Sequence, residues 1–341
     1  MIFHNRPTVG KKEMDAVKKT ISSGYLSQGK EVSKFERHFA NYMGIDEKNV
    51  VAVSNGTSAL YLALWALGAK NKKTIYPTYS CSSIRNASAL IGAKEKLCDI
   101  EMNSPNMSPF NDKEGDIIIA PHMYGFPINL LKRKGIKIIE DVCQSLGSTT
   151  KGKPLGLLGD LSIFSFYATK MITSCGQGGM IISKDKYLIK EIIDYVNFDN
   201  RRDKKKRFNF QMSDVQAAMG RVQLSRLNEF IEKRDKIFRY YKNLGLPLID
   251  IKYKNKNTSP VRYRIILMCK NPELIKRKLF LKNIAVINPL ETRELLSENK
   301  KFKFAKKLTK STISLPCYPS LKKSELIKIG KEIIKLEKYF N

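Results

Sequence analysis

One lysine of this lysine-rich chain has a setting that favours chemistry over solvation. Lys170, in SFYATKMITSCGQGG (165–179), follows apolar and small residues and precedes a glycine cluster, so the pattern predicts buried segments on both sides of it. Desolvating an ammonium group is costly unless it has a chemical partner, and a dry pocket lowers the pKa of a lysine. Such a lysine is a usable amine for Schiff-base chemistry with a carbonyl compound.

A carboxylate follows a predicted strand in IIEDVCQSLG (138–147). Glu140 and Asp141 end the strand, and Gln144 comes three residues after Asp141. A carboxylate at a strand end inside a packed domain needs a cationic or hydrogen-bond-donating partner. The residues leave two interpretations open: a helix cap or ion pair, and a carboxylate held against a protonated ring nitrogen.

A third motif, SNGTSAL (54–60), places Gly56, Thr57 and Ser58 at a predicted strand-to-helix turn. Free backbone N–H groups at a helix N-terminus, together with hydroxyls, bind anions, although Thr and Ser there are also ordinary helix caps. An anion cradle, a carboxylate and an amine together meet the needs of pyridoxal 5′-phosphate (PLP). No metal site is expected, because the six cysteines form no CxxC pair and no histidine is near one.

The segments that must position these residues alternate between strands and helices. An N-terminal helix is predicted from Met14, Val17 and Ile21, with Gly24 as its stop, and an apolar helix begins at Thr57. Such alternation predicts an α/β domain with a mostly parallel sheet, in which ligands bind at the carboxyl ends of the strands. The predicted strands lie in 48–56, 72–80, 116–125, 136–142, 163–169 and 178–185.

The C-terminal third has a different character. Residues 213–244 read as one long helix that starts near Ser213. After it, a strand at 261–270 and helical patterns at 271–287 and 324–340 indicate a small α+β unit. We therefore predict a large domain over residues 1–240, N-terminal helix included, and a small domain over 241–341.

Composition narrows the class of protein. The 341 residues are 42% hydrophobic and 28% charged, no apolar stretch is long enough to span a membrane, and the N-terminus lacks the apolar core of a signal peptide. Cysteines that occur singly suit reduced thiols, so a cytoplasmic protein is expected. The net charge of +30 raises the question of nucleic acid, but the densest basic run, Arg201–Arg207, has no interleaved aromatics and no nucleic-acid motif is found. We therefore expect the positive charge to form a solvated lysine-rich surface, or a surface that attracts phosphorylated small substrates.

With these motifs in view, the chain resembles the DegT-type (DegT/DnrJ/StrS) sugar aminotransferases. The resemblance runs nearly end to end and is most specific in IIEDVCQSLGSTTKGKPLGLLGDLSIFSFYATK (138–170). It implies the aspartate-aminotransferase-like fold of fold type I PLP enzymes. That fold has a large domain with a seven-stranded, mostly parallel sheet and a small C-terminal α+β domain.

The resemblance also implies a role for each motif residue. Lys170 would form the Schiff base with PLP and shuttle protons, Asp141 would pair with the pyridinium nitrogen, and Gln144 would lie near the phenolic oxygen. Asn209 would reach the phosphate from a partner subunit, which implies a homodimer with shared active sites. The phosphate would otherwise be held by Gly56, Thr57, Ser58 and Ser165. For Ser165 and Asn209, a role as turn residues stays open.

The chain departs from the family pattern at several positions. Cys81 stands where many relatives stack an aromatic residue on the cofactor, and Cys143 stands where an alanine usually packs under the ring. The loop after Lys170 has Gln177 in place of the usual Glu and is one residue longer. Gln211 replaces the usual Arg, and AVINPL (285–290) lacks a common His-Tyr pair. These changes bear on which sugar, and which of its carbons, is aminated.

The expected function is PLP-dependent transfer of an amino group from an amino acid, such as glutamate, to a nucleotide-linked keto sugar for surface-polysaccharide biosynthesis. Two alternatives are kept. One is another PLP reaction on a keto sugar or cyclic ketone, and the other is a catalytically silent, DNA-associating regulator suggested by the charge.

Overall fold

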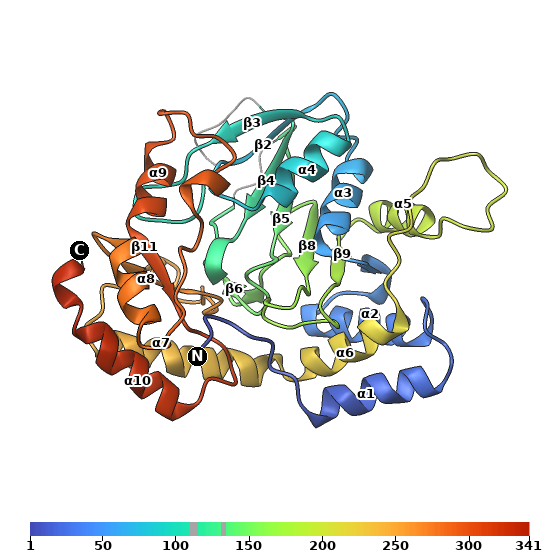
Figure 1. The fold of residues 1–341 in the computed structure, drawn as a ribbon. Coiled ribbons are helices and arrows are strands. Elements are labelled where there is room, and N and C mark those ends of the chain that lie inside the picture. The colour runs from blue at the N-terminus through green and yellow to red at the C-terminus, as the bar shows by residue number, and fades with distance from the viewer. Residues whose placement is uncertain (109–114, 131–133, 341) are drawn as a thin grey trace.

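The computed structural model describes residues 1–108, 115–130 and 134–340, and its centre is a seven-stranded sheet of order β1-β9-β8-β5-β4-β2-β3 (Figure 1). Only β9 runs antiparallel to its neighbours, β1 and β8. The predicted mostly parallel sheet is therefore confirmed. Its strands are β1 (Val50–Val53), β2 (Lys73–Pro77), β3 (Lys94–Cys98), β4 (Ile117–Pro121), β5 (Lys137–Asp141), β8 (Leu161–Ser165) and β9 (Gly179–Ile182).

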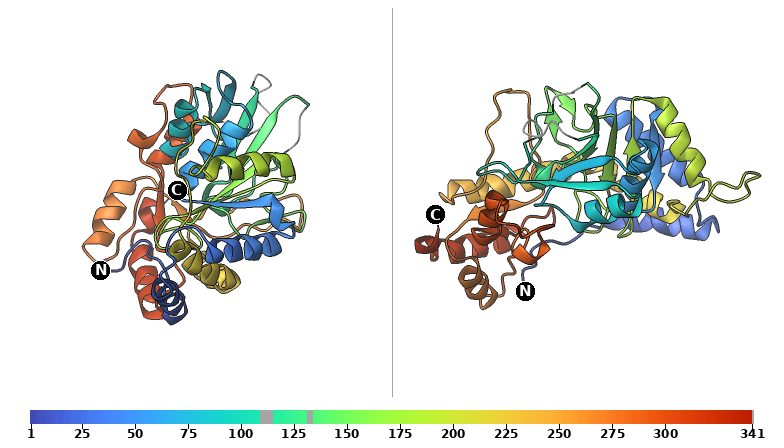
Figure 2. Two further views of the ribbon diagram at one scale, coloured as in Figure 1. Left: turned by 90° about the vertical axis from the view of Figure 1, so that its right-hand side faces the viewer. Right: turned by 90° about the horizontal axis from the view of Figure 1, so that it is seen from above.

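Helices cover both faces of this sheet, as a parallel sheet of apolar strands requires. On one face, α3 (Gly56–Ala66), α4 (Ser82–Leu90) and α5 (Lys186–Val196) enclose one apolar core. On the other face, α2 (Lys30–Met43) and α6 (Asp214–Ser225) pack over a second core (Figure 2). Two short strands, β6 (Thr149–Thr150) and β7 (Lys153–Pro154), form a separate pair.

The predicted N-terminal helix is present as α1 (Lys11–Ser22), but its buried face is polar. Glu13 is fully buried and accepts hydrogen bonds from Gln223 Nε2 at 2.8 Å and Arg226 Nη1 at 2.7 Å. The apolar Met14 and Ile21 are 59% and 55% exposed. The predicted helix is thus present, but two of its apolar residues, Met14 and Ile21, face away from the rest of the chain.

The prediction of one long helix from Ser213 is wrong. Ser213 does cap a helix, through the Gln216 N–H, but α6 ends at Ser225 and α7 (Leu227–Asn243) begins after Arg226. The backbone of Arg226 has φ −101° and ψ 1°, outside the helical range. The Arg226 guanidinium forms ion pairs with both Glu13 and Glu229. These ion pairs occur at the residue where the helix is interrupted.

The C-terminal part pairs β10 (Ile265–Met268) with β11 (Thr312–Leu315) and carries three helices, α8 (Pro272–Phe280), α9 (Lys303–Lys310) and α10 (Lys323–Ile334). Four short 3₁₀ helices complete the described chain: Glu47–Asn49, Met123–Gly125, Thr292–Glu294 and Glu337–Tyr339.

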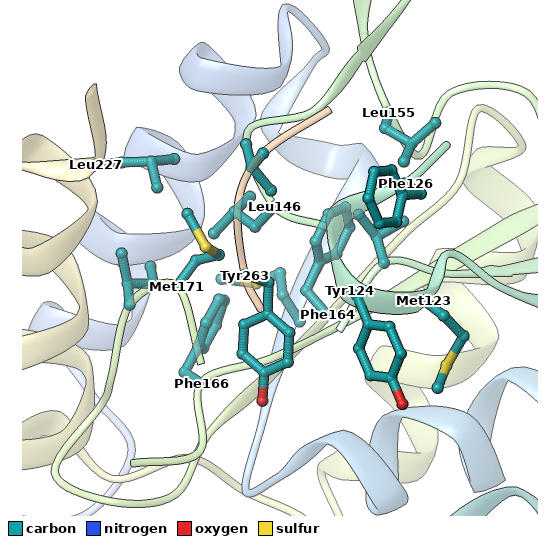
Figure 3. Close-up of a cluster of buried hydrophobic side chains, with 14 of the residues drawn as sticks. Met123, Tyr124, Phe126, Leu146, Leu155, Phe164, Phe166, Met171, Leu227 and Tyr263 are labelled. Atoms are coloured by element: carbon teal, nitrogen blue, oxygen red, sulfur yellow. The ribbon is translucent and has the colours of Figure 1, made fainter. Parts of the chain in front are cut away.

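Helix α7 contributes to two cores. Its Phe230 packs with the sheet core, whereas Ile237 and Tyr241 pack with β10, β11 and Ile2. Figure 3 shows the sheet core where Tyr263, from the C-terminal part, lies among Phe166, Met171 and other large-domain side chains. The division of the chain at residues 240 and 241 stays a prediction. In the part of the chain that is described, no helix is long and apolar enough to cross a membrane.

Candidate active site

A cavity of about 330 Å³ opens at the carboxyl ends of the central strands. Its walls come from the segments that follow β1, β2, β4, β5 and β8, because the carboxyl ends of parallel strands meet at one edge of a sheet. The lining residues are Asn55, Gly56, Thr57, Leu60, Ser80, Cys81, Ser83, Ile84, Pro121, Met123, Asp141, Cys143, Gln144, Ile163, Ser165, Tyr167, Lys170 and Gln177.

Seven of the nine predicted site residues line this cavity. Ser58 and Asn209 do not. Ser58 is buried, and its N–H and hydroxyl both bond to Asn55 Oδ1, at 2.8 and 3.1 Å, so it belongs to the helix cap. Asn209 is exposed, and its Oδ1 accepts the backbone N–H of Gln211 at 3.1 Å. The seven that do are Gly56, Thr57, Cys81, Asp141, Gln144, Ser165 and Lys170.

Lys170 is positioned by a hairpin-like loop between β8 and β9. The backbone N–H of Phe166 donates to Gly178 O at 2.8 Å and that of Ala168 donates to Gly176 O at 3.1 Å, so the two arms of the loop are tied together. The Lys170 N–H closes a turn on Tyr167 O at 2.9 Å. Its Nζ lies 5.5 Å from the centre of the Tyr263 ring, at the cavity wall.

The sequence predicted a lowered pKa for Lys170, but in the folded chain this pKa is raised. Burial by itself lowers this pKa, but the phenol of Tyr263, the thiol of Cys143 and the carboxylate of Asp141 raise it by more. The same pairing lowers the pKa of Tyr263, since the nearby cations outweigh the effect of its burial. The charged neighbours of Lys170, rather than its burial, set the direction in which its pKa is shifted.

The two acids of the IIED motif have separate roles. Glu140 is fully buried and accepts the backbone N–H groups of Leu158 and Gly159, at 2.7 and 2.6 Å, with His122 Nε2 at 3.3 Å. Asp141 faces the cavity, and its Oδ1 accepts a local hydrogen bond from the Cys143 N–H at 3.0 Å. The cap-or-ion-pair interpretation therefore applies to Glu140, and Asp141 is the carboxylate available to a ligand.

The anion cradle is built on the N-terminus of α3. Asn55, which the sequence reasoning missed, is its N-cap and accepts the Ser58 N–H at 2.8 Å. An Asn between a strand and an apolar helix is a recognisable cap signal. Thr57, in the first turn, is exposed and lines the cavity. A Cβ on Gly56 would lie 2.8 Å from the Ser165 Cβ, so only glycine allows this turn to approach β8 so closely.

The opposite wall is formed by Gln144. Its Oε1 accepts the Tyr124 N–H at 2.9 Å, which leaves its NH₂ as the group offered to the cavity. Three of the departures from the family pattern, Cys81, Cys143 and Gln177, also line the cavity, whereas Gln211 does not. Ser80, Ser83 and Tyr167 line it as well and carried no signal in the sequence.

These residues fit PLP by the chemistry of their donor groups. Gly56, Thr57 and Ser165 surround a helix N-terminus that suits a phosphate. At the carboxyl end of β5, Asp141 offers a carboxylate to a pyridinium nitrogen, and Lys170 offers an amine to an aldehyde. The cradle at Gly56 and the amine at Lys170 are both within one cavity, as a single ligand that uses both would require.

The close approach at Gly56 gives a direct test of the cradle. Gly56→Ala is expected to lower the free energy of unfolding by about 1–3 kcal/mol, as overpacking does, and to weaken PLP binding. Thermal unfolding and a PLP titration measure the two effects. The matched control is Gly10→Ala, where a Cβ would meet only Glu13 Oε2 at 3.6 Å and Arg226 Nη1 at 3.8 Å. Equal effects of the two substitutions would contradict the cradle.

Comparison with known proteins places this geometry in a family. The DegT/DnrJ/EryC1/StrS aminotransferase family matches residues 7–334. The chain is 30% identical to the UDP-4-amino-4,6-dideoxy-N-acetyl-beta-L-altrosamine transaminase of Campylobacter jejuni over 96% of both chains. It is 29% identical to the GDP-perosamine synthase of Escherichia coli O157:H7, again over 96% of each.

A solved structure shows the same fold. The aminotransferase TlmJ from Streptoalloteichus hindustanus superposes with a TM-score of 0.90 over 98% of each chain, at 24% identity. The expected aspartate-aminotransferase-like fold is thereby confirmed. The match covers the sheet, the loop that carries Lys170 and the C-terminal part. The chain therefore belongs to the DegT/DnrJ/EryC1/StrS family of PLP-dependent aminotransferases.

Proposed function

We propose that this enzyme transfers an amino group from an amino acid, glutamate in the first instance, to the keto carbon of a nucleotide-linked sugar. The observation that carries the proposal is the single cavity in which Lys170, Asp141 and the N-terminus of α3 converge. Relatives named for GDP- and UDP-linked amino sugars support the substrate class. A relative that is named a spore coat polysaccharide biosynthesis protein, from Bacillus subtilis, supports a place in polysaccharide biosynthesis.

The residues divide the work of the reaction. PLP, when bound, supplies an electron sink that stabilises negative charge on the carbon next to the transferred nitrogen. Asp141 would hold the ring nitrogen in its protonated form through its carboxylate. The Lys170 amine would accept and return a proton at Nζ. The N–H groups of α3 and the hydroxyls of Thr57 and Ser165 would hold the phosphate.

We include a homodimer with shared sites in this proposal. Next to the exposed Met14 and Ile21 of α1, Tyr25 and Leu26 are 80% and 48% exposed, which gives an apolar surface suited to a second copy. The segment between α5 and α6 extends away from the body of the subunit (Figures 1 and 2). It carries Asn209, which lies outside the cavity of its own chain.

The same segment carries the basic run Arg201–Arg207. Arg207 pairs with Asp194 and Asp203, both at 2.7 Å, so it shapes the segment. Lys204 and Lys206 are exposed. We assign these exposed cations to the diphosphate of the nucleotide sugar in the partner's cavity. None of the six cysteines forms a disulfide in the described structure, which suits a reducing compartment, so we include a cytoplasmic location in the proposal.

The shared site predicts complementation between two inactive variants. Lys170→Ala and Asn209→Asp should each be inactive, and mixed dimers should recover part of the activity, because one of their two sites has both native residues. The experiment is to refold the two variants together, verify heterodimers by mass, and assay amination. If verified heterodimers stay inactive, or if Asn209→Asp alone stays active, each site is complete within one subunit.

The reaction itself is tested in two half-reactions. With PLP bound, L-glutamate should bleach the cofactor's absorbance band, and a nucleotide-linked keto sugar should restore it. Mass spectrometry of the product, with GDP-, UDP- and dTDP-linked keto sugars in parallel, identifies the nucleotide. Bleaching by glutamate without restoration by any keto sugar would refute the substrate class. No bleaching would point to another PLP reaction.

A further inference from the structure

A fully buried tyrosine beside the active-site cavity has a backbone conformation that bulky residues rarely adopt. Tyr124, 1% exposed, has φ 58° and ψ 16°, in the left-handed region. For a bulky side chain this conformation is an outlier, and it persists only where the surrounding structure enforces it. The contacts that enforce it therefore point to a function for the Tyr124 backbone.

The N–H of Tyr124 reaches the wall of the active-site cavity. It donates to Gln144 Oε1 at 2.9 Å, and both Gln144 and the preceding residue, Met123, line the cavity. A backbone N–H can only donate, so this bond decides which end of the Gln144 amide faces a ligand. The end left for the cavity is the NH₂, a donor. With the amide turned over, the same position would offer an acceptor.

The side chain of Asn106 joins the two ends of the turn that carries this N–H. Asn106 Oδ1 accepts the Met123 N–H at 2.8 Å, and Asn106 Nδ2 donates to Phe126 O at 2.9 Å. Figure 3 shows the side chains of Met123, Tyr124 and Phe126 that leave this turn. Asn106 comes from the segment after β3, whereas the turn follows β4. It is 4% exposed and is not among the residues that line the active-site cavity.

Two serines hold other groups of the same turn. Ser145 Oγ donates to His122 O at 2.6 Å, and Ser148 Oγ donates to Gly125 O at 2.8 Å. Both serines act on single carbonyl groups, whereas Asn106 bonds to an N–H before Tyr124 and to a carbonyl after it. Asn106 is therefore the side chain that sets the span of the turn.

We propose that Asn106 is a positioning residue for the cofactor, acting through the Tyr124 turn and the Gln144 amide. The family resemblance sets Gln144 beside the phenolic oxygen of PLP. A donor there stabilises negative charge on that oxygen, so it lowers the pH midpoint at which the bound cofactor gives up its proton. The assignment rests on the PLP site of the proposed function and adds to it a residue outside the cavity.

The test is a pH titration of the cofactor's absorbance in the full-length enzyme, with PLP bound and no substrate present. Asn106→Ala should raise the midpoint by about 1 pH unit, as expected when one hydrogen bond to a charged group is lost. The matched control is Asn49→Ala. Asn49 is 5% exposed, and its Nδ2 also donates to a backbone carbonyl, that of Ser183, next to the amino end of β1. Asn49→Ala should lower the thermal stability and leave the midpoint as it is in wild type.

A double variant shows whether Asn106 acts through Gln144. Gln144→Ala should raise the midpoint at least as much as Asn106→Ala does, and the double variant should show no further rise, because the two side chains act in one series of contacts. Additive shifts, or a wild-type midpoint in Asn106→Ala, would overturn the assignment. If Asn106→Ala does not fold, Asn106→Asp decides by the same criteria, since it keeps the acceptor for the Met123 N–H and loses the donor to Phe126 O. The titration involves no amino transfer, so an enzyme that binds PLP but aminates no keto sugar refutes the proposed function, and the midpoints still decide on Asn106.

Discussion

Lys170→Ala should leave a folded protein that no longer transfers amino groups. Removing the proton-transfer group alone costs about 10²–10⁴ in rate, and loss of the Schiff-base amine adds to this. The fold should persist, because the loop is held by backbone hydrogen bonds of Phe166 and Ala168 and not by the Lys170 side chain. Steady-state amination and thermal unfolding measure the two parts of this prediction.

The control for Lys170→Ala is Lys184→Ala, an exposed lysine just after β9. Wild-type protein reduced with borohydride in the presence of PLP should carry the label on Lys170, found by peptide mass. The alanine variant should carry none there and should still bind PLP noncovalently through the α3 cradle. Retained amination by Lys170→Ala, or a label on another lysine, would remove Lys170 from the mechanism.

Asp141→Ala should reduce amination by about 10²–10³-fold, the effect of removing one preorganised electrostatic partner, or roughly 3–4 kcal/mol. The physical reason is that the pyridinium loses its counter-charge and with it the proton that makes the ring an electron sink. Asp141→Asn keeps the shape and should be nearly as slow. The measurement is the rate of glutamate half-reaction at saturating PLP.

Glu232→Gln, which removes an exposed carboxylate on α7, is the control for the Asp141 variants. The Asp141 carboxylate accepts a local hydrogen bond, from the Cys143 N–H, so the fold should tolerate the loss of this side chain. Near wild-type rates in Asp141→Ala would mean that another group holds the ring nitrogen.

The order of motifs along the chain was enough to predict the sheet and most of the cavity, because each of these motifs lies where a strand ends. Short apolar strands followed by small or polar residues were enough to identify Gly56, Asp141 and Ser165 as candidates. Parallel topology then brings those ends together. The break at Arg226 could not be read in the same way, because it accompanies a pairing with Glu13, more than 200 positions earlier.

The charged groups around Lys170 could not be predicted from the sequence, for a related reason. Tyr263 lies about 90 positions after Lys170, and VRYRIILM carries no motif that marks it. The local pattern predicted a dry lysine, whereas the folded chain surrounds it with a phenol, thiols and a carboxylate that reverse the effect of burial on its pKa. The polar face of α1 was missed similarly, because its partners are on α6 and α7.

The antiparallel pairing of β8 and β9 fixes both ends of the loop that carries Lys170, so the position of this lysine does not depend on the length of the loop. Ser165 and Gly179 are register partners, so both ends of the lysine loop are pinned to the sheet. The turn itself is at Cys175 and Gly176, whose φ angles are 51° and 91°. A residue gained or lost at that tip shifts neither strand, so the tip can drift during evolution while the amine keeps its place.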